Sequence, residues 1–226
     1  MARRLSGIIV VGVFSVLTSL AVGVAPALAT LYDLNLNNLG IAGSIGTVTT
    51  SLVGSSINVS VAMKPGFDMF GNTLTFGFNQ VATEGALTIS TLTPGYAVGC
   101  ANCSPLVQYS TFGRFENNIT DGVGAASGTI GHDLLSFNVS RPLGFTADTQ
   151  LTELSTSPGG GFTPAFFAVK FGVCVDAACS AFSTTGFGAS NTVPEPGTLA
   201  LFATGLVGVG ALFGTRLFNR GRRETV

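Results

Sequence analysis

The side chains that could act as acid–base catalysts are few. His132 is the only histidine in the chain, and Gly131 and Asp133 flank it. A Ser-His-Asp hydrolase would need this histidine as its base. The Gly-x-Ser-x-Gly element of many such enzymes is absent, and on a strand Asp133 would point away from His132. We therefore interpret His132 as a surface residue of a turn and predict no catalytic residue in the chain.

Paired carboxylates could instead hydrolyse a glycosidic bond if two of them faced each other across a sugar. The available acids, most of them beside turn-forming residues, are Glu84, Glu116, Asp121, Asp133, Asp148 and Glu153. Acids in turns usually serve solubility and local hydrogen bonding. Segment 33–37 begins like a calcium-binding loop, but Asn38 and Ser44 stand where that loop needs Gly and Glu. We expect no enzymatic site, metal site or cofactor.

The four cysteines form two close pairs, Cys100-Ala-Asn-Cys103 and Cys174-Val-Asp-Ala-Ala-Cys179. Four cysteines permit three disulfide connectivities, and the sequence does not choose among them. The signals at the chain ends predict export to a compartment in which disulfides persist. We favour two local bridges, each of which would close a turn. A zinc site of four thiolates and a thioredoxin-like redox pair are the alternatives, and the latter would need a βαβ context.

The segments that would position these groups have the alternating pattern of short β-strands. Apolar and polar residues alternate in 57–63, 74–78, 87–89, 135–139 and 167–175, and Pro-, Gly- and Asn-containing turns separate these runs. No helical period is evident between Thr30 and Val193. The pattern predicts an all-β domain, an antiparallel β-sandwich or jelly roll of about eight to ten strands.

Composition supports a folded domain and argues against binding to nucleic acid. The 226-residue chain is 46% hydrophobic and 9% charged, and its net charge is -1. A nucleic-acid-binding protein would carry an excess of basic residues. With 18 Phe and no Trp, phenylalanine must supply most of the bulk of the core.

The N-terminus has the order of a secretory signal peptide. Two arginines precede an apolar run from Ile8 to Val24, and the small residues Ala27 and Ala29 follow it. Because the pocket of signal peptidase admits only small side chains at these two places, we predict cleavage after Ala29. This assigns residues 1–29 to the signal peptide and places the domain 30–192 outside the cytoplasm. An uncleaved N-terminal anchor is the alternative.

The C-terminus combines three features within 193–226. Val-Pro-Glu-Pro at 193–196 is followed by an uncharged apolar segment, 197–215. This segment is close to the ~20 residues needed to span a bilayer. The basic residues after it are Arg216, Arg220, Arg222 and Arg223. Such residues stay in the cytoplasm, so we predict a single transmembrane helix with a cytoplasmic tail, 216–226. Prolines disfavour helix in the preceding residues and keep the motif extended.

This three-part ending resembles the PEP-CTERM sorting signal, which exosortase recognises. The resemblance implies that Pro194, Glu195 and Pro196 form the recognition element, and that the helix holds the precursor in the inner membrane until exosortase cuts near the motif. It also implies a Gram-negative bacterium that makes exopolysaccharide and biofilm. An ordinary C-terminal anchor is the alternative.

These observations together predict an exported cell-surface or biofilm-matrix protein with a non-catalytic structural or adhesive domain. Its expected partners are signal peptidase, the general secretion machinery, the inner membrane and exosortase. A carbohydrate-binding module that tethers exopolysaccharide to the envelope is the second hypothesis, and a secreted hydrolase is the third.

Overall fold

The computed structural model describes residues 29–191 except 72, 82–84, 122–131, 158 and 160. The predicted leader up to residue 28, including Ala27, and the predicted sorting signal from residue 193 lie outside the described residues. The predicted transmembrane helix also lies outside the described residues. No helix in the described part of the chain is long and apolar enough to span a bilayer.

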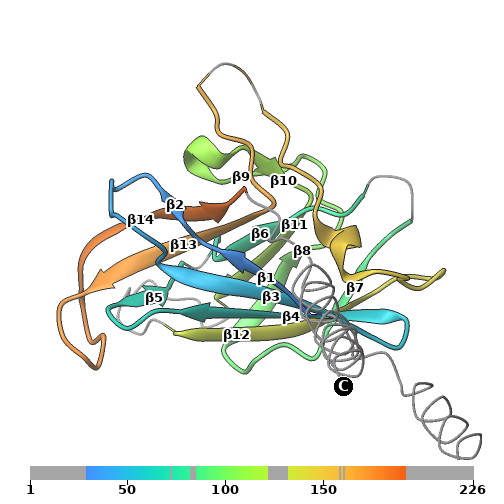
Figure 1. Cartoon of the computed structure of the whole chain (residues 1–226), viewed down its shortest axis with the longest axis horizontal. Coiled ribbons are helices and arrows are strands. Elements are labelled where there is room, and N and C mark those ends of the chain that lie inside the picture. Colours follow the sequence, from blue (N-terminus) through green and yellow to red (C-terminus); the bar gives the residue numbers. More distant parts are fainter. Residues whose placement is uncertain are drawn as a thin grey trace, which may run out of the picture.

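The described chain folds into antiparallel sheets, which confirms the all-β prediction (Figure 1). A five-stranded sheet has the order β1 (Ala29–Asp33), β3 (Gly46–Val53), β4 (Ser56–Met63), β12 (Leu134–Ser140), β7 (Thr88–Ser90). A seven-stranded sheet has the order β2 (Leu36–Asn37), β14 (Phe182–Ser190), β13 (Phe167–Cys174), β6 (Phe76–Phe78), β11 (Asn117–Asp121), β8 (Tyr96–Cys100), with β5 (Phe67–Met69) also paired to β13.

A small two-stranded ribbon and two short 3-10 helices complete the described fold. The ribbon pairs β9 (Val107–Gln108) with β10 (Arg114–Phe115), and the helices are η1 (Ser110–Phe112) and η2 (Asp148–Leu151). The strands number 14 in the described part, more than the eight to ten expected. Several have only two or three residues, too few to produce a recognisable alternation in the sequence.

The predicted alternation agrees with burial in the five-stranded sheet. In β4 the residues from Ile57 to Met63 are buried at every second position, and in β12 the buried residues are Leu135, Phe137 and Val139. One face of each strand therefore enters the core, as the period of two requires. β3 and β4 form a hairpin, and Gly54 in its two-residue turn has a φ of 62°, which suits glycine.

Aromatic rings join the two large sheets. The Phe137 ring on β12 lies 6.0 Å from that of Phe76 and 5.5 Å from that of Phe78, both on β6 of the other sheet. Phe76 also stacks on Phe167 of β13, with ring centroids 5.8 Å apart. All four rings are fully buried. Phenylalanine therefore fills the space between the sheets, as the composition predicted.

The β9–β10 ribbon and η1 build a second apolar cluster on the other face of the seven-stranded sheet. Tyr109, Phe112 and Phe115 pack there with Ala168 of β13 and other small residues. Burial raises the pKa of Tyr109, and its hydroxyl donates a hydrogen bond to the Asn118 side chain. Apolar clusters therefore pack against both faces of β13, which explains why this strand is buried at consecutive positions rather than at alternate ones.

Replacing Phe137 by alanine should remove the ring that bridges the sheets. We expect Phe137→Ala to lower the free energy of unfolding by about 3 to 5 kcal/mol, measured by urea denaturation. Leu143 is 87% exposed, so Leu143→Ala is the matched control. It should change this free energy by less than about 0.5 kcal/mol. Equal losses in the two variants would contradict the assigned core.

Candidate functional site

Several reactive groups of the described residues surround a cavity of about 480 Å³ beside Asp68. Lys64, Asp68, His132, Asp133 and the Cys174–Cys179 disulfide line it. Backbone pairing positions these groups. β5 pairs with β13 so that Asp68 lies opposite Gly172, and the Cys174 N–H donates to the Gly66 carbonyl at 2.9 Å.

Electrostatics make Asp68 the most perturbed carboxyl of this cavity. Burial raises its pKa, the nearby Asp133 charge raises it further, and His132 acts in the opposite direction. The sequence analysis did not single out Asp68, because it stands between Phe67 and Met69 in a strand of three residues. Only the tertiary pairing of β5 with β13 brings it near other polar groups.

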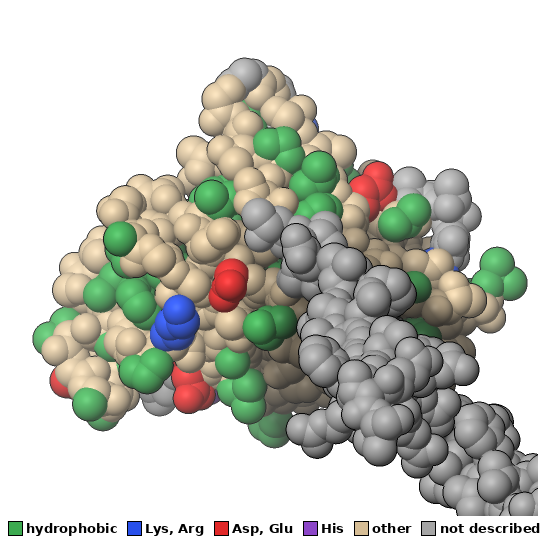
Figure 2. Space-filling model, viewed as in Figure 1, with side chains coloured by type: hydrophobic (Ala, Val, Ile, Leu, Met, Phe, Trp, Pro, Cys, Tyr) green, Lys and Arg blue, Asp and Glu red, His purple; other side chains and the backbone are tan. Residues whose placement is uncertain are grey.

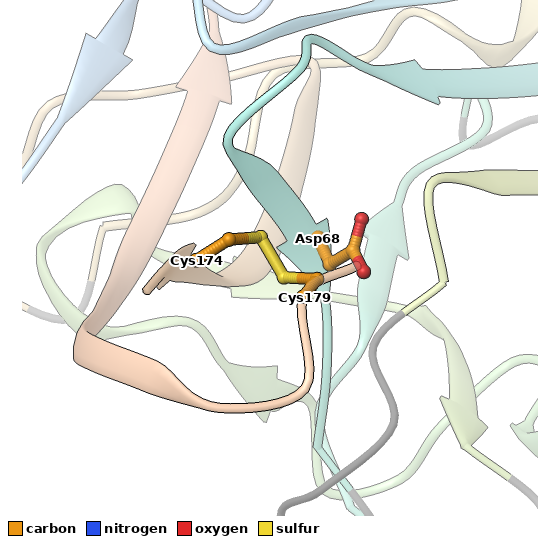
Figure 3. Close-up of side chains that lie close together, drawn as sticks. All are labelled: Asp68, Cys174 and Cys179. Carbon is orange, nitrogen blue, oxygen red and sulfur yellow. A yellow bond between two sulfur atoms is a disulfide. The ribbon is translucent and has the colours of Figure 1, made fainter. Parts of the chain in front are cut away.

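Asp68 also lies next to the sulfur atoms of Cys174 and Cys179 (Figure 3). One potential ligand atom from each residue falls within 4.8 Å of the others. The two sulfurs are bonded to each other, however, and a metal ion would need them as thiolates. In this oxidised form the cluster offers a metal one carboxylate.

Both disulfides join the nearer cysteine, which is the local pairing favoured from the sequence. Cys100 at the end of β8 bonds to Cys103, and Cys174 at the end of β13 bonds to Cys179. The Cα atoms of these pairs are 5.5 and 4.7 Å apart, within the usual range for disulfides. Each bridge closes a turn that follows a strand.

His132 is half-buried rather than on a surface turn. Its backbone forms an isolated bridge with Met69, in which each N–H donates to the other residue's carbonyl. Its ring packs 5.1 Å from the Tyr96 ring. No serine forms a hydrogen bond with the His132 ring in the part of the chain described here.

The predicted acids fall into three separate places. Asp121 and Asp133 lie near Tyr96, whose pKa is raised first by burial and then by these acids and Asp68. Glu116 lies near Glu153, and burial followed by the Glu153 charge raises the pKa of Glu116. Asp148 stands apart, beside β1, and Glu84 is outside the described residues.

Glu116 lines a second cavity, of about 340 Å³, with Gln80 and Asn102. The Gln80 side-chain N–H group donates to the Gly85 carbonyl at 2.9 Å, and Asn102 accepts from the Leu87 N–H at 3.3 Å. These amides hold the connections between strands together. Their hydrogen bonds to nearby backbone account for these two polar side chains in the lining of the cavity.

The part of the molecule drawn in colour in Figure 2 shows a few charged side chains scattered among hydrophobic side chains, polar side chains and backbone. A charged fraction of 9% leaves few such groups to distribute. A polyanionic ligand would be attracted by a continuous basic field, and the described residues visible on this face do not present one.

Comparison with family models decides the class of the C-terminal segment. The model described as the PEP-CTERM protein-sorting motif matches residues 192–223. The chain carries a PEP-CTERM sorting signal. The match includes Pro194, Glu195 and Pro196 and extends to Arg223. No curated protein and no solved structure matches the chain. The resemblance noted from the sequence is thus confirmed, and the motif implies an exported protein that exosortase processes in the envelope.

Asp68 predicts a pH-dependent change of stability. A carboxyl with a raised pKa in the folded state is unfavourable above that pKa, and the penalty disappears below its unfolded pKa. Asp68→Asn should therefore raise the midpoint of urea unfolding at pH 7 and leave it unchanged near pH 3. Hydrogen bonds from Ser180 lower the pKa of Asp176. Asp176→Asn is the matched control and should lower the midpoint at pH 7. The same sign for both variants would contradict this assignment.

The two disulfides should add modest stability, because each closes a short loop. Replacing Cys174 and Cys179 together by serine is expected to lower the free energy of unfolding by about 2 kcal/mol, as is the corresponding change at Cys100 and Cys103. Urea unfolding of the oxidised proteins measures both. The variant lacking all four cysteines should not respond to dithiothreitol, and a response would show that the reductant acts elsewhere.

Proposed function

We propose that the chain is an exported surface or biofilm-matrix protein of a Gram-negative bacterium, released by exosortase, whose β-sheet domain has a structural or adhesive role without catalysis. The observation that carries this proposal is the sorting motif matched at 192–223. A sorting signal of this kind acts only on a chain that has been exported, and the predicted leader 1–29 would direct that export.

The charge pattern near the C-terminus supports a temporary tether. The apolar segment 197–215 ends at Arg216, and three more arginines follow within 220–223. Moving this cationic group across the bilayer would be unfavourable, so the tail stays inside and the β-domain outside. Pro194 and Pro196 disfavour helix in the residues before them, so we expect an extended motif at the place where exosortase would bind.

The described domain has features that suit life outside the cytoplasm. All four cysteines are in disulfides, which persist in oxidising compartments. Aromatic rings fill the space between the sheets. Export of such a β-domain fits a structural or adhesive role.

The contacts of the reactive groups support a role without catalysis. The His132 ring packs on Tyr96, and the described residues place no serine in hydrogen-bond contact with it. Glu116 and Glu153 lie near each other, and the cavity beside Glu116 is also lined by Gln80 and Asn102, whose side-chain amides form hydrogen bonds with neighbouring backbone. These contacts support the proposal of a domain without catalysis.

Glu195→Ala tests the sorting step. In a host with exosortase, we expect the wild-type chain to lose its C-terminal arginines and leave the membrane fraction. The Glu195→Ala chain should keep them and remain in that fraction. An antibody to a tag placed after Val226 measures whether the C-terminus is retained. An antibody to the β-domain measures whether the domain remains in the membrane fraction. Glu224→Ala, in the tail beyond the motif, is the matched control and should behave as wild type.

Two outcomes would contradict the proposal. One is equal processing of the wild type and Glu195→Ala. The other is processing of the wild type in a host that lacks exosortase, because a different protease would then be responsible.

A further inference from the structure

Asp148 is a largely buried carboxylate whose described hydrogen-bond donors are neutral. It begins η2, and 7% of its surface is exposed. Its Oδ2 atom accepts a hydrogen bond from the Thr30 N–H at 3.0 Å and another from the Thr50 hydroxyl at 3.3 Å. A buried carboxylate is stabilised more strongly by a cationic donor than by a neutral one.

The strand that carries Thr30 lies at the edge of its sheet. β1 pairs with β3 on one side, and Thr30 lies opposite Thr50 in this register. The Thr30 N–H also donates to the Asp148 side chain, a contact outside the pairing of β1 with β3. A side chain from a segment 118 residues further along the chain thus holds the first residues of β1.

The loop before Asp148 is fixed independently of β1. The Gln150 Oε1 atom accepts hydrogen bonds from the Thr146 and Ala147 N–H groups at 2.8 and 3.1 Å. Leu151, at the end of η2, is fully buried in the main core. Asp148 is therefore held in position by its own segment and does not depend on Thr30 for its place.

Among the described residues, the other groups that face Asp148 carry no positive charge. On β1 the facing group is the buried Tyr32 hydroxyl, which lies near the hydroxyls of Thr50 and Thr152. Burial, followed by the charge of Asp148, raises the pKa of Tyr32 to about 12, so this hydroxyl is neutral at physiological pH. On β3 the facing group is the Thr50 hydroxyl, and on η2 the next buried side chain is Leu151. The Thr30 nitrogen is the one position among these where a chemical change could create a cation.

We propose that Asp148 is the binding site for the new amino terminus that removal of the leader creates. This inference rests on cleavage between Ala29 and Thr30, which belongs to the proposed function. Hydrolysis breaks the peptide C–N bond: the water hydroxyl joins the Ala29 carbonyl carbon, and the Thr30 nitrogen becomes an amine that takes up a proton. The resulting ammonium forms on the atom that already contacts Asp148, so the neutral hydrogen bond becomes an ion pair with Thr30 in its place, while Ala29, the first residue of β1, leaves with the leader.

The pair makes the stability of the domain depend on maturation. With the leader attached, β1 is held by an amide hydrogen bond, and after cleavage it is held by a charge-assisted one. The carboxylate raises the pKa of the new amine above its ordinary value of about 7.7 to 8.0. The added stability is fully present below the ordinary pKa and is lost as the pH rises through the folded pKa.

Two chains that differ by one residue test this inference. One begins at Thr30 and the other at Ala29; both extend to Val226 and are compared in the same detergent. At pH 6.5 we expect the melting temperature of the Thr30 chain to be about 5 °C higher. This difference should disappear at pH 10, and also in the Asp148→Asn background. Equal melting temperatures at pH 6.5 would overturn the proposal.

A second measurement avoids dependence on a variant that fails to fold. Reductive ¹³C-dimethylation keeps the charge of the amine, and NMR then follows its titration in the Thr30 chain. We expect a pKa above about 8.5, whereas a value at or below about 8 would overturn the ion pair. The N-terminal mass of the exported protein checks the cleavage separately. A start at another residue would overturn the role in the cell while leaving the comparison of the two chains intact, so the two failures are distinguishable.

Discussion

The contact between aromatic rings of the two sheets is the interaction on which the rest of the described structure depends. Phe137 from one sheet meets Phe76 and Phe78 from the other, and Phe167 stacks on Phe76. These rings hold the sheets face to face, and the loops at the sheet ends take their places from that arrangement. The Asp68 cavity and the Thr30–Asp148 contact both lie at strand ends or loops that this core positions.

Short-range chemistry explains the connections around this core. Each disulfide closes a turn after a strand, and amide side chains such as Asn102 bond to neighbouring backbone. Such devices stabilise loops without adding charge, which fits a chain of which 9% is charged. Apolar burial and local cross-links thus stabilise the domain. The segments that flank it carry the signals for export and sorting.

Local patterns predicted the parts of the fold that depend on local chemistry. The alternation in β4 and β12 identified the buried residues, because burial alternates with a period of two in a strand that has one solvent-exposed face. The consecutive burial in β13 could not be predicted, since it depends on the β9–β10 ribbon that covers the second face. Asp68 was missed for a similar reason: its neighbours come from β13 and the segment at His132, far away in the chain.

The central claim is that the chain is exported and then cut from a temporary membrane tether. The intact mass of the protein recovered from outside a cell that has exosortase tests this claim most directly, because one spectrum reports both ends. The account predicts a chain that begins at Thr30 and lacks the arginines from Arg216 onward. A recovered chain that still ends at Val226 would contradict it.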